Sequence, residues 1–377
     1  MTETISSLTI ALLATSRLPL QTAVTLYEAA GSACGVLEHR GNIRDIMPDA
    51  TDTLVELMKS DLSSYIKRAE EEQEWCARKG VRILTYADSD YPCRLRNCPD
   101  APLVLFVRGK CNLNADHIIS IVGTRKSTPY GKDVVDGIVR DLRQQCPDVV
   151  VLSGLAYGID IIAHRAALRN DIPTVGVVAH GQDRIYPQLH RDEANKMVLG
   201  NGAVVTEYFH GTAPEPRNFL QRNRIIAGMS DATIVAESAS HGGGLVTARI
   251  AQDYGREVFA IPGPINAEFS QGCNNLIRDN KAALVSSATD IVNAMMWQNA
   301  GQAAQARRQG IERTLFPTLT PEEQAIVNAL KEHGDSQSNA LTAYTGLPIN
   351  TVVAQLFSLE MKGVITPLSG NTFHLIS

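Results

Sequence analysis

Residues 217–224 carry the densest group of side chains that could bind a nucleic acid. The stretch reads Arg217-Asn218-Phe219-Leu220-Gln221-Arg222-Asn223-Arg224. Three guanidinium groups around one phenylalanine are the combination expected for single-stranded nucleic acid, because arginines neutralise phosphates while a ring stacks on a base. The alternative is that these arginines form structural salt bridges. The stretch is expected to be a loop that leads into a helix over residues 221–230.

A second candidate anion site follows the apolar run at 117–122. Gly123 permits close backbone approach, Thr124 supplies a hydroxyl, and Arg125 and Lys126 supply positive charge just before a helix begins. This set of groups is typical of an oxyanion or phosphate cradle. An ordinary turn with solvated charges remains the alternative.

Two further loops could contribute to the same site. One contains Ser153-Gly154 at the end of a predicted strand, and the other is the run Gly242-Gly243-Gly244, which opens a helix containing Thr247. A glycine run at a helix start offers several backbone N–H groups to an anion. Asp160 and His164 lie one helical turn apart and resemble an acid–base pair, but a helix-stabilising contact at this spacing is the more ordinary explanation.

The motifs of common catalytic and cofactor sites are missing. No G-x-S-x-G elbow surrounds Ser153, and no G-x-G-x-x-G follows the first predicted strand. Gly131-Lys132 is followed by Asp133, where a Walker motif needs Ser or Thr to hold Mg²⁺. The acids that could form a metal or general-base cluster stand singly in different loops: Asp160, Asp183, Glu207 and Glu237. We therefore expect no catalytic residue, no cofactor and no metal.

The elements that must position these residues alternate between apolar strands and amphipathic helices from about residue 118 to 293. Such an alternation predicts a parallel sheet covered on both faces, which is a doubly wound, Rossmann-like α/β core. Ligands bind such sheets at the carboxyl ends of the strands, where the candidate residues lie. The predicted strands are 117–122, 148–153, 174–179, 202–207, 232–237, 256–261 and 282–287, and the main helices are 130–145, 159–168, 221–230 and 245–254.

The length of 377 residues favours two or three domains. We expect an N-terminal helical domain over 1–75, the α/β core over 80–297, a small polar linker over 298–316 and a winged helix over 317–377. In the last segment, Thr320 can cap a helix that begins at Pro321, and two more helices and a β-ribbon around Gly370-Asn371 follow.

Composition narrows the class of protein. Seven cysteines without a C-x-x-C pair predict neither a disulfide framework nor a zinc site. The net charge of −5 argues against a broadly basic coat but allows a local basic groove. No run reaches the roughly 18 uncharged apolar residues that span a bilayer, and Glu3 precedes the first apolar run without a basic region. We expect a cytoplasmic protein with no membrane contact.

Ordered motifs over about residues 80–290 closely resemble the DNA-processing protein A family, also called Smf. The lead-in YADSDYPCRL at 86–95 is also similar. The motifs are GTR (123–125), SGLAYGID (153–160), QDRIYP (182–187), RNRIIAG (222–228), VTARIA (246–251), GREVFAIPG (255–263) and GCNNLI (272–277).

The resemblance implies a protein that binds single-stranded DNA without sequence preference and helps to load the recombinase RecA onto it in natural transformation, as a homodimer. It also implies an N-terminal helical domain and a C-terminal winged helix around an extended Rossmann core. Carried over by motif, the DNA pocket of the family falls on Gly123, Thr124, Arg125, Arg222 and Arg224, with Phe219 nearby. This chain has Leu220 where the family usually has proline and Gln221 where it often has a basic residue.

Two other functions remain as alternatives. A nucleotide phosphoribohydrolase of similar fold would need the motif P-G-G-x-G-T-x-x-E, but Ile250 stands at the glutamate position after Thr247. A regulator that reads duplex DNA through its winged helix would need cations there. Residues 317–377 contain two lysines against five acids, a formal charge of −3.

Overall fold

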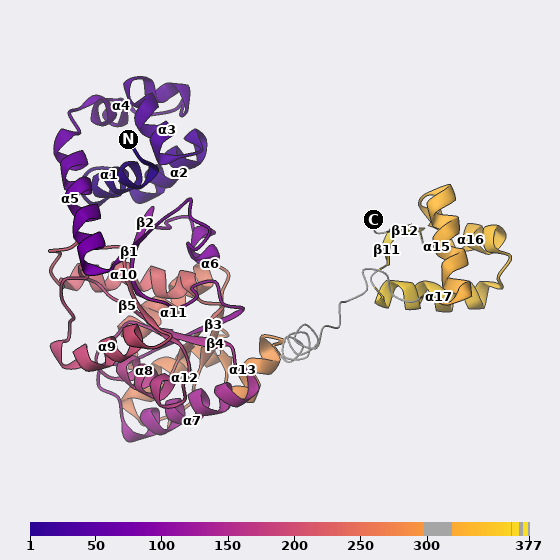
Figure 1. The fold of residues 1–377 in the computed structure, drawn as a ribbon. Helices are drawn as coiled ribbons and strands as arrows, with labels where there is room; N and C mark the ends of the chain where they lie inside the picture. Colours follow the sequence, from indigo (N-terminus) through magenta and orange to yellow (C-terminus); the bar gives the residue numbers. More distant parts are fainter. Residues whose placement is uncertain (298–318, 363, 369–371, 376–377) are drawn as a thin grey trace. The chain divides into compact units, whose positions relative to one another are not determined.

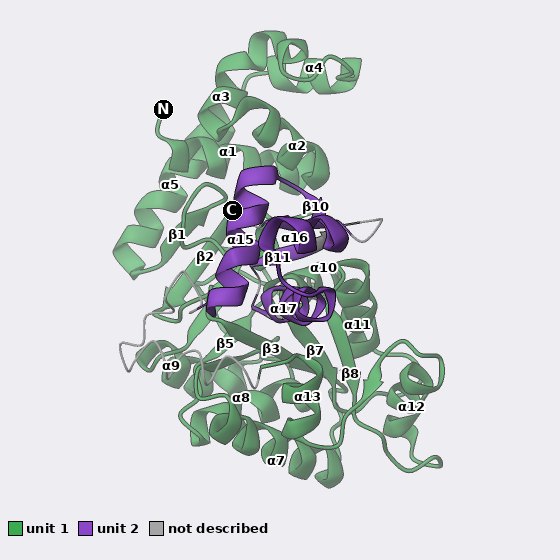
Figure 2. Ribbon diagram, turned by 90° about the vertical axis from the view of Figure 1, so that its right-hand side faces the viewer, with its two compact units in different colours: residues 1–301 green, residues 302–377 purple. Residues whose placement is uncertain are grey.

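The computed structural model describes residues 1–297, 319–362, 364–368 and 372–375 of the chain (Figure 1). It forms two compact units, residues 1–301 and residues 302–377 (Figure 2). The expected linker over 298–316 lies outside the described residues. No helix among the residues described is long and apolar enough to cross a membrane.

Unit 1 begins with five α-helices. The longest, α5, continues to Lys79 and ends at Gly80, whose φ of +64° suits a helix C-cap. Buried side chains of these helices belong to the same apolar cluster as β1 and β2, so the helical region packs on the edge of the sheet. The helices are α1 (Glu3–Ser16), α2 (Leu20–Ala30), α3 (Ala33–Glu38), α4 (Asp52–Lys59) and α5 (Ser63–Lys79).

The core of unit 1 is a nine-stranded sheet of order β1-β2-β6-β5-β4-β3-β7-β8-β9. The seven strands from β3 onward are parallel, whereas β1 and β2 pair antiparallel at one edge. The strands are β1 (Arg82–Thr85), β2 (Val104–Gly109), β3 (His117–Val122), β4 (Val149–Ser153), β5 (Thr174–Val177), β6 (Ala203–Thr206), β7 (Ala232–Val235), β8 (Glu257–Ala260) and β9 (Ala283–Leu284).

Helices cover both faces of this sheet. Apolar residues of α7, α8 and α13 pack on one face, and those of α10, α11 and α12 pack on the other. Successive residues of β3 point to opposite faces, because Ile119 and Ile121 join one cluster while Ile118 and Val122 join the other. The helices after the first strand are α6 (Cys93–Arg96), α7 (Pro129–Gln145), α8 (Ile159–Arg169), α9 (Arg191–Leu199), α10 (Pro216–Met229), α11 (Gly243–Asp253), α12 (Gln271–Arg278) and α13 (Ala288–Ala294).

The predicted doubly wound core is confirmed, and all seven predicted strands are present. Two details differ from the prediction. The antiparallel strands β1 and β2 lie outside the α/β alternation that guided the assignment. The prediction of a loop over residues 217–224 is wrong, because these residues belong to α10, which begins at Pro216. Proline is favoured at the first position of a helix.

Unit 2 has the predicted winged-helix architecture: three helices and a small sheet of order β10-β12-β11. Gly346 ends the middle helix with a φ of +70°, which suits a glycine C-cap at the bend before α17. The turn at Gly370-Asn371 lies outside the described residues, between the two strands of the predicted ribbon. The elements are α15 (Pro321–His333), β10 (Ser336–Gln337), α16 (Ser338–Thr345), α17 (Ile349–Met361), β11 (Ile365–Leu368) and β12 (Thr372–Leu375).

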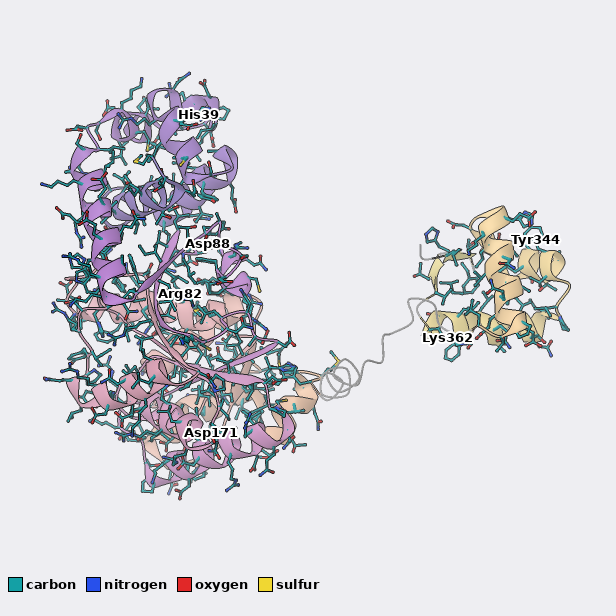
Figure 3. The ribbon with its side chains drawn as sticks, viewed as in Figure 1. His39, Arg82, Asp88, Asp171, Tyr344 and Lys362 are labelled. Carbon is teal, nitrogen blue, oxygen red and sulfur yellow. The ribbon has the colours of Figure 1, made fainter. Side chains whose placement is uncertain are left out.

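The Glu323 side chain links the start of α15 to the end of α17. Its buried carboxylate accepts hydrogen bonds from the Thr320 backbone N–H at 2.7 Å, completing the predicted N-cap, and from Ser358 Oγ at 2.7 Å. Lys362 Nζ, at the end of α17 (Figure 3), lies 2.6 Å from the same carboxylate. The hydrogen bond from Lys362, followed by those from the Thr320 N–H and the Ser358 hydroxyl, lowers the pKa of Glu323 to about 2 against the opposing effect of burial.

We expect Glu323→Gln to destabilise unit 2 by about 2 kcal/mol, since hydrogen bonds to a charged group are lost. The folded-state pKa lies below the unfolded value, so the stability from this carboxylate is present above pH 4.5 and lost as the pH falls toward 2. Hydrogen exchange of the α15 amides in the full chain measures this effect. Glu322→Gln, next to it on the exposed side, is the control and should keep the acid dependence, whereas Glu323→Gln should abolish it.

Candidate nucleic-acid interface

The candidate residues gather where the strand order of the sheet reverses, beside β3. Gly123 follows β3, and Gly244 lies in the first turn of α11, which follows β7. A Cβ on Gly244 would lie 3.1 Å from Gly123 Cα, and a Cβ on Gly123 would lie 2.7 Å from Glu237 O. Glycine is therefore needed at position 123 so that the two loops can approach each other. The sequence predicted a glycine here for close approach to an anion, and the structure shows a packing reason for it.

Hydrogen bonds to Glu237 and Ile159 hold the loop after β3 in place. The Thr124 N–H donates to Glu237 O at 2.7 Å, and Thr124 O accepts from the Ile159 N–H at 3.1 Å. The buried Glu237 carboxylate accepts from the Thr128 N–H at 2.9 Å and from Thr128 Oγ1 at 2.5 Å. This leaves Arg125 and Lys126 exposed at the tip of a rigid loop.

Arg222 is placed differently from the phosphate-binding residue that the sequence led us to expect. Its side chain is only 3% exposed, and Nη1 donates to Gly154 O at 2.7 Å and to Val177 O. These carbonyls lie at the carboxyl ends of β4 and β5. The guanidinium therefore anchors α10 to the sheet.

Burial lowers the pKa of Arg222 to about 10, with the charge of Asp160 acting in the opposite direction. Burial in turn raises the pKa of the Asp160 carboxyl, against the effect of Arg222. A Cβ on Gly154 would lie 2.6 Å from both the Arg222 guanidinium and the Asp160 carboxylate. Asp160 thus belongs to the support of α10. The helix-stabilising contact with His164 that the spacing favoured is wrong, as is the acid–base alternative, because the His164 ring bonds Thr174 Oγ1 at 2.7 Å instead.

Phe219 lies one helical turn before Arg222 on α10, and its ring faces the Arg222 guanidinium. The Phe219 ring centroid is 5.2 Å from Arg125 Cζ and 5.9 Å from Arg222 Cζ, both within cation–π range. The Tyr186 ring, 43% exposed, is 5.8 Å away and tilted by 57°. The partly exposed Phe219 ring and the Tyr186 ring form an aromatic surface beside the cation of Arg125.

The other predicted residues divide into two groups. Asn223 Nδ2 donates to Gly243 O at 3.4 Å and so joins α10 to the glycine run. In contrast, Ser153 and Thr247 are buried, with their hydroxyls donating to Ile121 O and Gly243 O. They support the site from within and present no free hydroxyl at its surface.

Arg224 lies two residues beyond Arg222, and residues two apart on a helix face different directions, so Arg224 is turned away from the side of α10 that carries Arg222. Its guanidinium pairs with Glu207 and lies 3.9 Å from Asp100. Burial raises the pKa of the Glu207 carboxyl even beside this arginine. Arg224 therefore follows the salt-bridge alternative that the sequence left open.

The glycine run supplies donors to the surface. Gly242 and Gly243 are exposed, whereas Gly244 is buried against Gly123. Within the described part of the chain no acceptor bonds the N–H groups of Gly243 and Gly244. These groups open α11, where the helix dipole favours an anion. The described ranges contain no group of three potential metal ligands.

Comparison with known proteins gives the site its context. The model of the DNA recombination-mediator protein A family matches residues 82–296, and that of the DprA winged helix domain matches residues 313–371. The chain belongs to the DNA recombination-mediator protein A family. The family resemblance inferred from the motifs is thereby confirmed.

Relatives of the family extend over most of the chain. A putative DNA processing protein DprA from Mycobacterium tuberculosis is 34% identical, over 79% of this chain and 78% of its own length. Protein Smf from Escherichia coli is 33% identical, over 78% of this chain and 77% of its own.

Two solved structures of the family are similar to this fold. DprA from Streptococcus pneumoniae has a TM-score of 0.65 and 30% identity, covering 78% of this chain and 98% of that one. DNA processing protein A from Helicobacter pylori, whose structure is described in terms of a single-stranded DNA binding mode, has a TM-score of 0.51 and 28% identity. It covers 57% of this chain and 95% of its own.

We expect Arg222→Ala to destabilise unit 1 by about 2–4 kcal/mol, because two buried carbonyls lose their donor. Urea unfolding followed by the fluorescence of Trp75 and Trp297, both in unit 1, measures the loss. Arg125→Ala, at an exposed position, is the control and should change the unfolding free energy by less than about 0.5 kcal/mol. Equal stability of both variants would contradict the anchoring role.

Proposed function

We propose that this family member binds single-stranded DNA without sequence preference at the carboxyl edge of its sheet. The observation that carries the proposal is the contact between Arg125 and Phe219: an exposed guanidinium 5.2 Å from the centroid of a partly exposed ring. The first can neutralise a phosphate, and the second can stack on a base of any identity. The N–H group of the exposed Gly243, at the start of α11, offers a further contact to phosphate.

The residues proposed to touch DNA are therefore fewer than the DNA-binding residues predicted from the sequence. Arg125, Lys126, Phe219 and the glycine run would touch DNA, whereas Arg222, Asn223, Ser153 and Thr247 would hold these groups in place. Tyr186 joins the first set. The sequence carried a signal for it, since Tyr186 belongs to the QDRIYP motif, but no spacing rule connected it to Phe219.

The proposal includes a role as recombination mediator. The family resemblance implies that the bound strand is passed to RecA, by a homodimer, in the cytoplasm and in connection with natural transformation. Such a role requires binding and release of a strand and no chemical step, in keeping with a site whose exposed groups are cations, rings and backbone donors. The proposed function is therefore non-catalytic.

For unit 2 we propose a role in protein contacts and not in reading duplex DNA. Lys362, one of its two lysines, is paired with Glu323. The side chains of Ile349, Val353 and Phe357, spaced four residues apart along α17, are 44%, 53% and 65% exposed. A groove-reading helix needs cations on its exposed face, whereas this face is apolar.

Two measurements on the full chain and one on a truncated chain test the proposed function against its alternatives. We expect tighter binding of a single strand than of a duplex of equal length, and no release of base or phosphate from nucleotides. Deleting residues from Arg313 onward should leave single-strand affinity within a few-fold. Loss of duplex binding on that deletion, with weak single-strand binding throughout, would favour the duplex regulator instead.

Arg125→Ala should weaken single-strand binding by about 1–2 kcal/mol, because one charged phosphate contact is lost. The slope of log K against log salt should also fall by roughly 0.7. Fluorescence anisotropy at several salt concentrations measures both quantities. Arg140→Ala removes an exposed arginine that pairs with Asp141 and should change neither, so an equal effect of the two variants would reject the site.

Phe219→Ala should weaken binding by roughly 1–3 kcal/mol, and by similar amounts for different base compositions, if the ring stacks on a base. The affinity is measured together with the free energy of unfolding, because the ring also packs near Tyr186. Leu220→Ala, at the adjacent position whose side chain is 56% exposed, is the control. A loss of stability with unchanged affinity per folded molecule would show that Phe219 is only a packing residue.

A further inference from the structure

A second basic surface lies at the opposite edge of the sheet. A hollow of about 640 Å³ is lined by Arg82 of β1, Arg108 of β2, Lys110 just after β2 and Val198 of α9. Gly109 pairs with Ala203, the first residue of β6, so the hollow opens at the amino ends of the parallel strands. It is thus on the other side of the sheet from Arg125 and Phe219.

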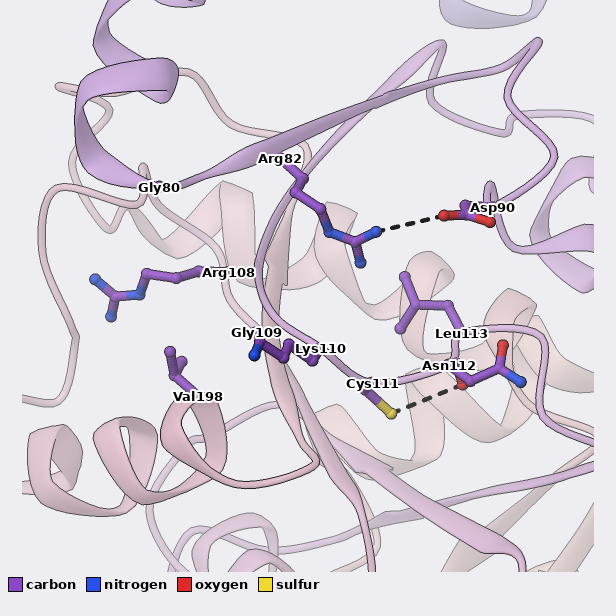
Figure 4. A pocket seen from close by; sticks show the side chains of 10 residues that line it. All are labelled: Gly80, Arg82, Asp90, Arg108, Gly109, Lys110, Cys111, Asn112, Leu113 and Val198. Carbon is purple, nitrogen blue, oxygen red and sulfur yellow. Dashed lines mark hydrogen bonds and ion pairs between the residues drawn. The ribbon is translucent and has the colours of Figure 1, made fainter.

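Arg108 lacks the compensation that a partly buried arginine usually has. Its Nε is buried and has no hydrogen-bond partner within the described part of the chain. Figure 4 shows the guanidinium of Arg82 turned toward Asp90 and that of Arg108 turned away from it. Burial, and then the positive charge of Arg191 at the start of α9, lower the pKa of Arg108.

The balance of charge in the hollow is positive. Of the described residues that line it, Asp90 alone carries a carboxylate, and this lies 3.4 Å from Arg82 Nη1. Lys110 is exposed and has no carboxylate within ion-pair distance among the residues described. Arg108 and Lys110, two residues apart at the end of β2, therefore offer two uncompensated cations.

The lining favours a phosphodiester backbone over a small organic ligand. Pockets for small ligands are mostly apolar and aromatic, whereas none of the described lining residues is aromatic. Lys110, Asn112 and Asp90 are exposed, so the hollow is open to solvent. Separate cations on an open surface suit the phosphates of an extended strand.

We propose that Arg108 and Lys110 form a second contact for single-stranded DNA, used by strands long enough to reach both edges of the sheet. The parallel strands β3 to β8 have four to six residues, so at about 3.3 Å per residue their two ends lie about 13–20 Å apart. The hollow at β2 is also four strand spacings of about 4.8 Å away from β3, so a DNA strand must cover both distances to reach the two sites. The proposal rests on the function proposed above, because it extends the path of the same strand. This second contact would increase the affinity for long single strands and the salt dependence of their binding, without recognising particular bases.

The test compares oligothymidylates of about 6 and about 30 nucleotides, lengths within and beyond the size of a single binding site. Arg108→Gln should weaken binding of the long strand roughly tenfold and Lys110→Gln a few-fold, each lowering the salt slope by about 0.7. Both variants should bind the short strand as the unmodified protein does. Arg108→Lys, which keeps the charge, should restore most of the long-strand affinity.

Lys59→Gln, which removes an exposed lysine from α4, is the matched control and should bind both strands normally. Unchanged long-strand affinity and slope in both hollow variants would overturn the second contact, as would equal losses for the two strand lengths. Arg125→Ala measured on the short strand separates this result from failure of the proposed function. If that variant binds the short strand normally, the carboxyl-edge site is rejected, whatever the hollow variants show.

Discussion

The candidate interface depends on one buried guanidinium. Arg222 donates to the carbonyls of Gly154 and Val177, the groups that end or follow two adjacent parallel strands. Carbonyls at strand ends have left the ladder and need a donor, since an unsatisfied buried carbonyl is destabilising by roughly 1–3 kcal/mol. Because Arg222 is on α10, satisfying them also fixes the helix that carries Phe219 above the loop with Arg125.

Close packing at the reversal of strand order completes this arrangement. Gly123 lies against Gly244 and Glu237 so tightly that a side chain on Gly123 would displace backbone atoms. The buried Glu237 carboxylate then bonds Thr128 and holds the start of α7. The exposed cation, the ring and the free N–H groups are therefore presented on rigid elements, which limits the entropy lost when a strand binds.

An acidic protein can bind nucleic acid when its cations are local and uncompensated. The chain has a net charge of −5, and many of its arginines pair with acids, as Arg224 does with Glu207. Arg125, Arg108 and Lys110 have no such carboxylate partner among the described residues. Where a phosphate backbone would bind depends on the positions of these cations at the two ends of the parallel strands and not on the net charge of the protein.

The fold class, the strands from β3 onward, the winged helix and the loops that meet at the carboxyl edge could all be predicted from the amino-acid sequence. These follow from local periodicity, turn residues and capping, which the chain carries residue by residue. The antiparallel pair β1 and β2 and the basic hollow beside it could not be predicted, because pairing of distant segments leaves no periodic signal. Which arginines face outward depends on how α10 packs on the sheet, and the sequence carries no sign of it. Arg222 and Arg224 are equivalent in the sequence, yet a helix turns them to different faces, where one meets strand-end carbonyls and the other meets Glu207.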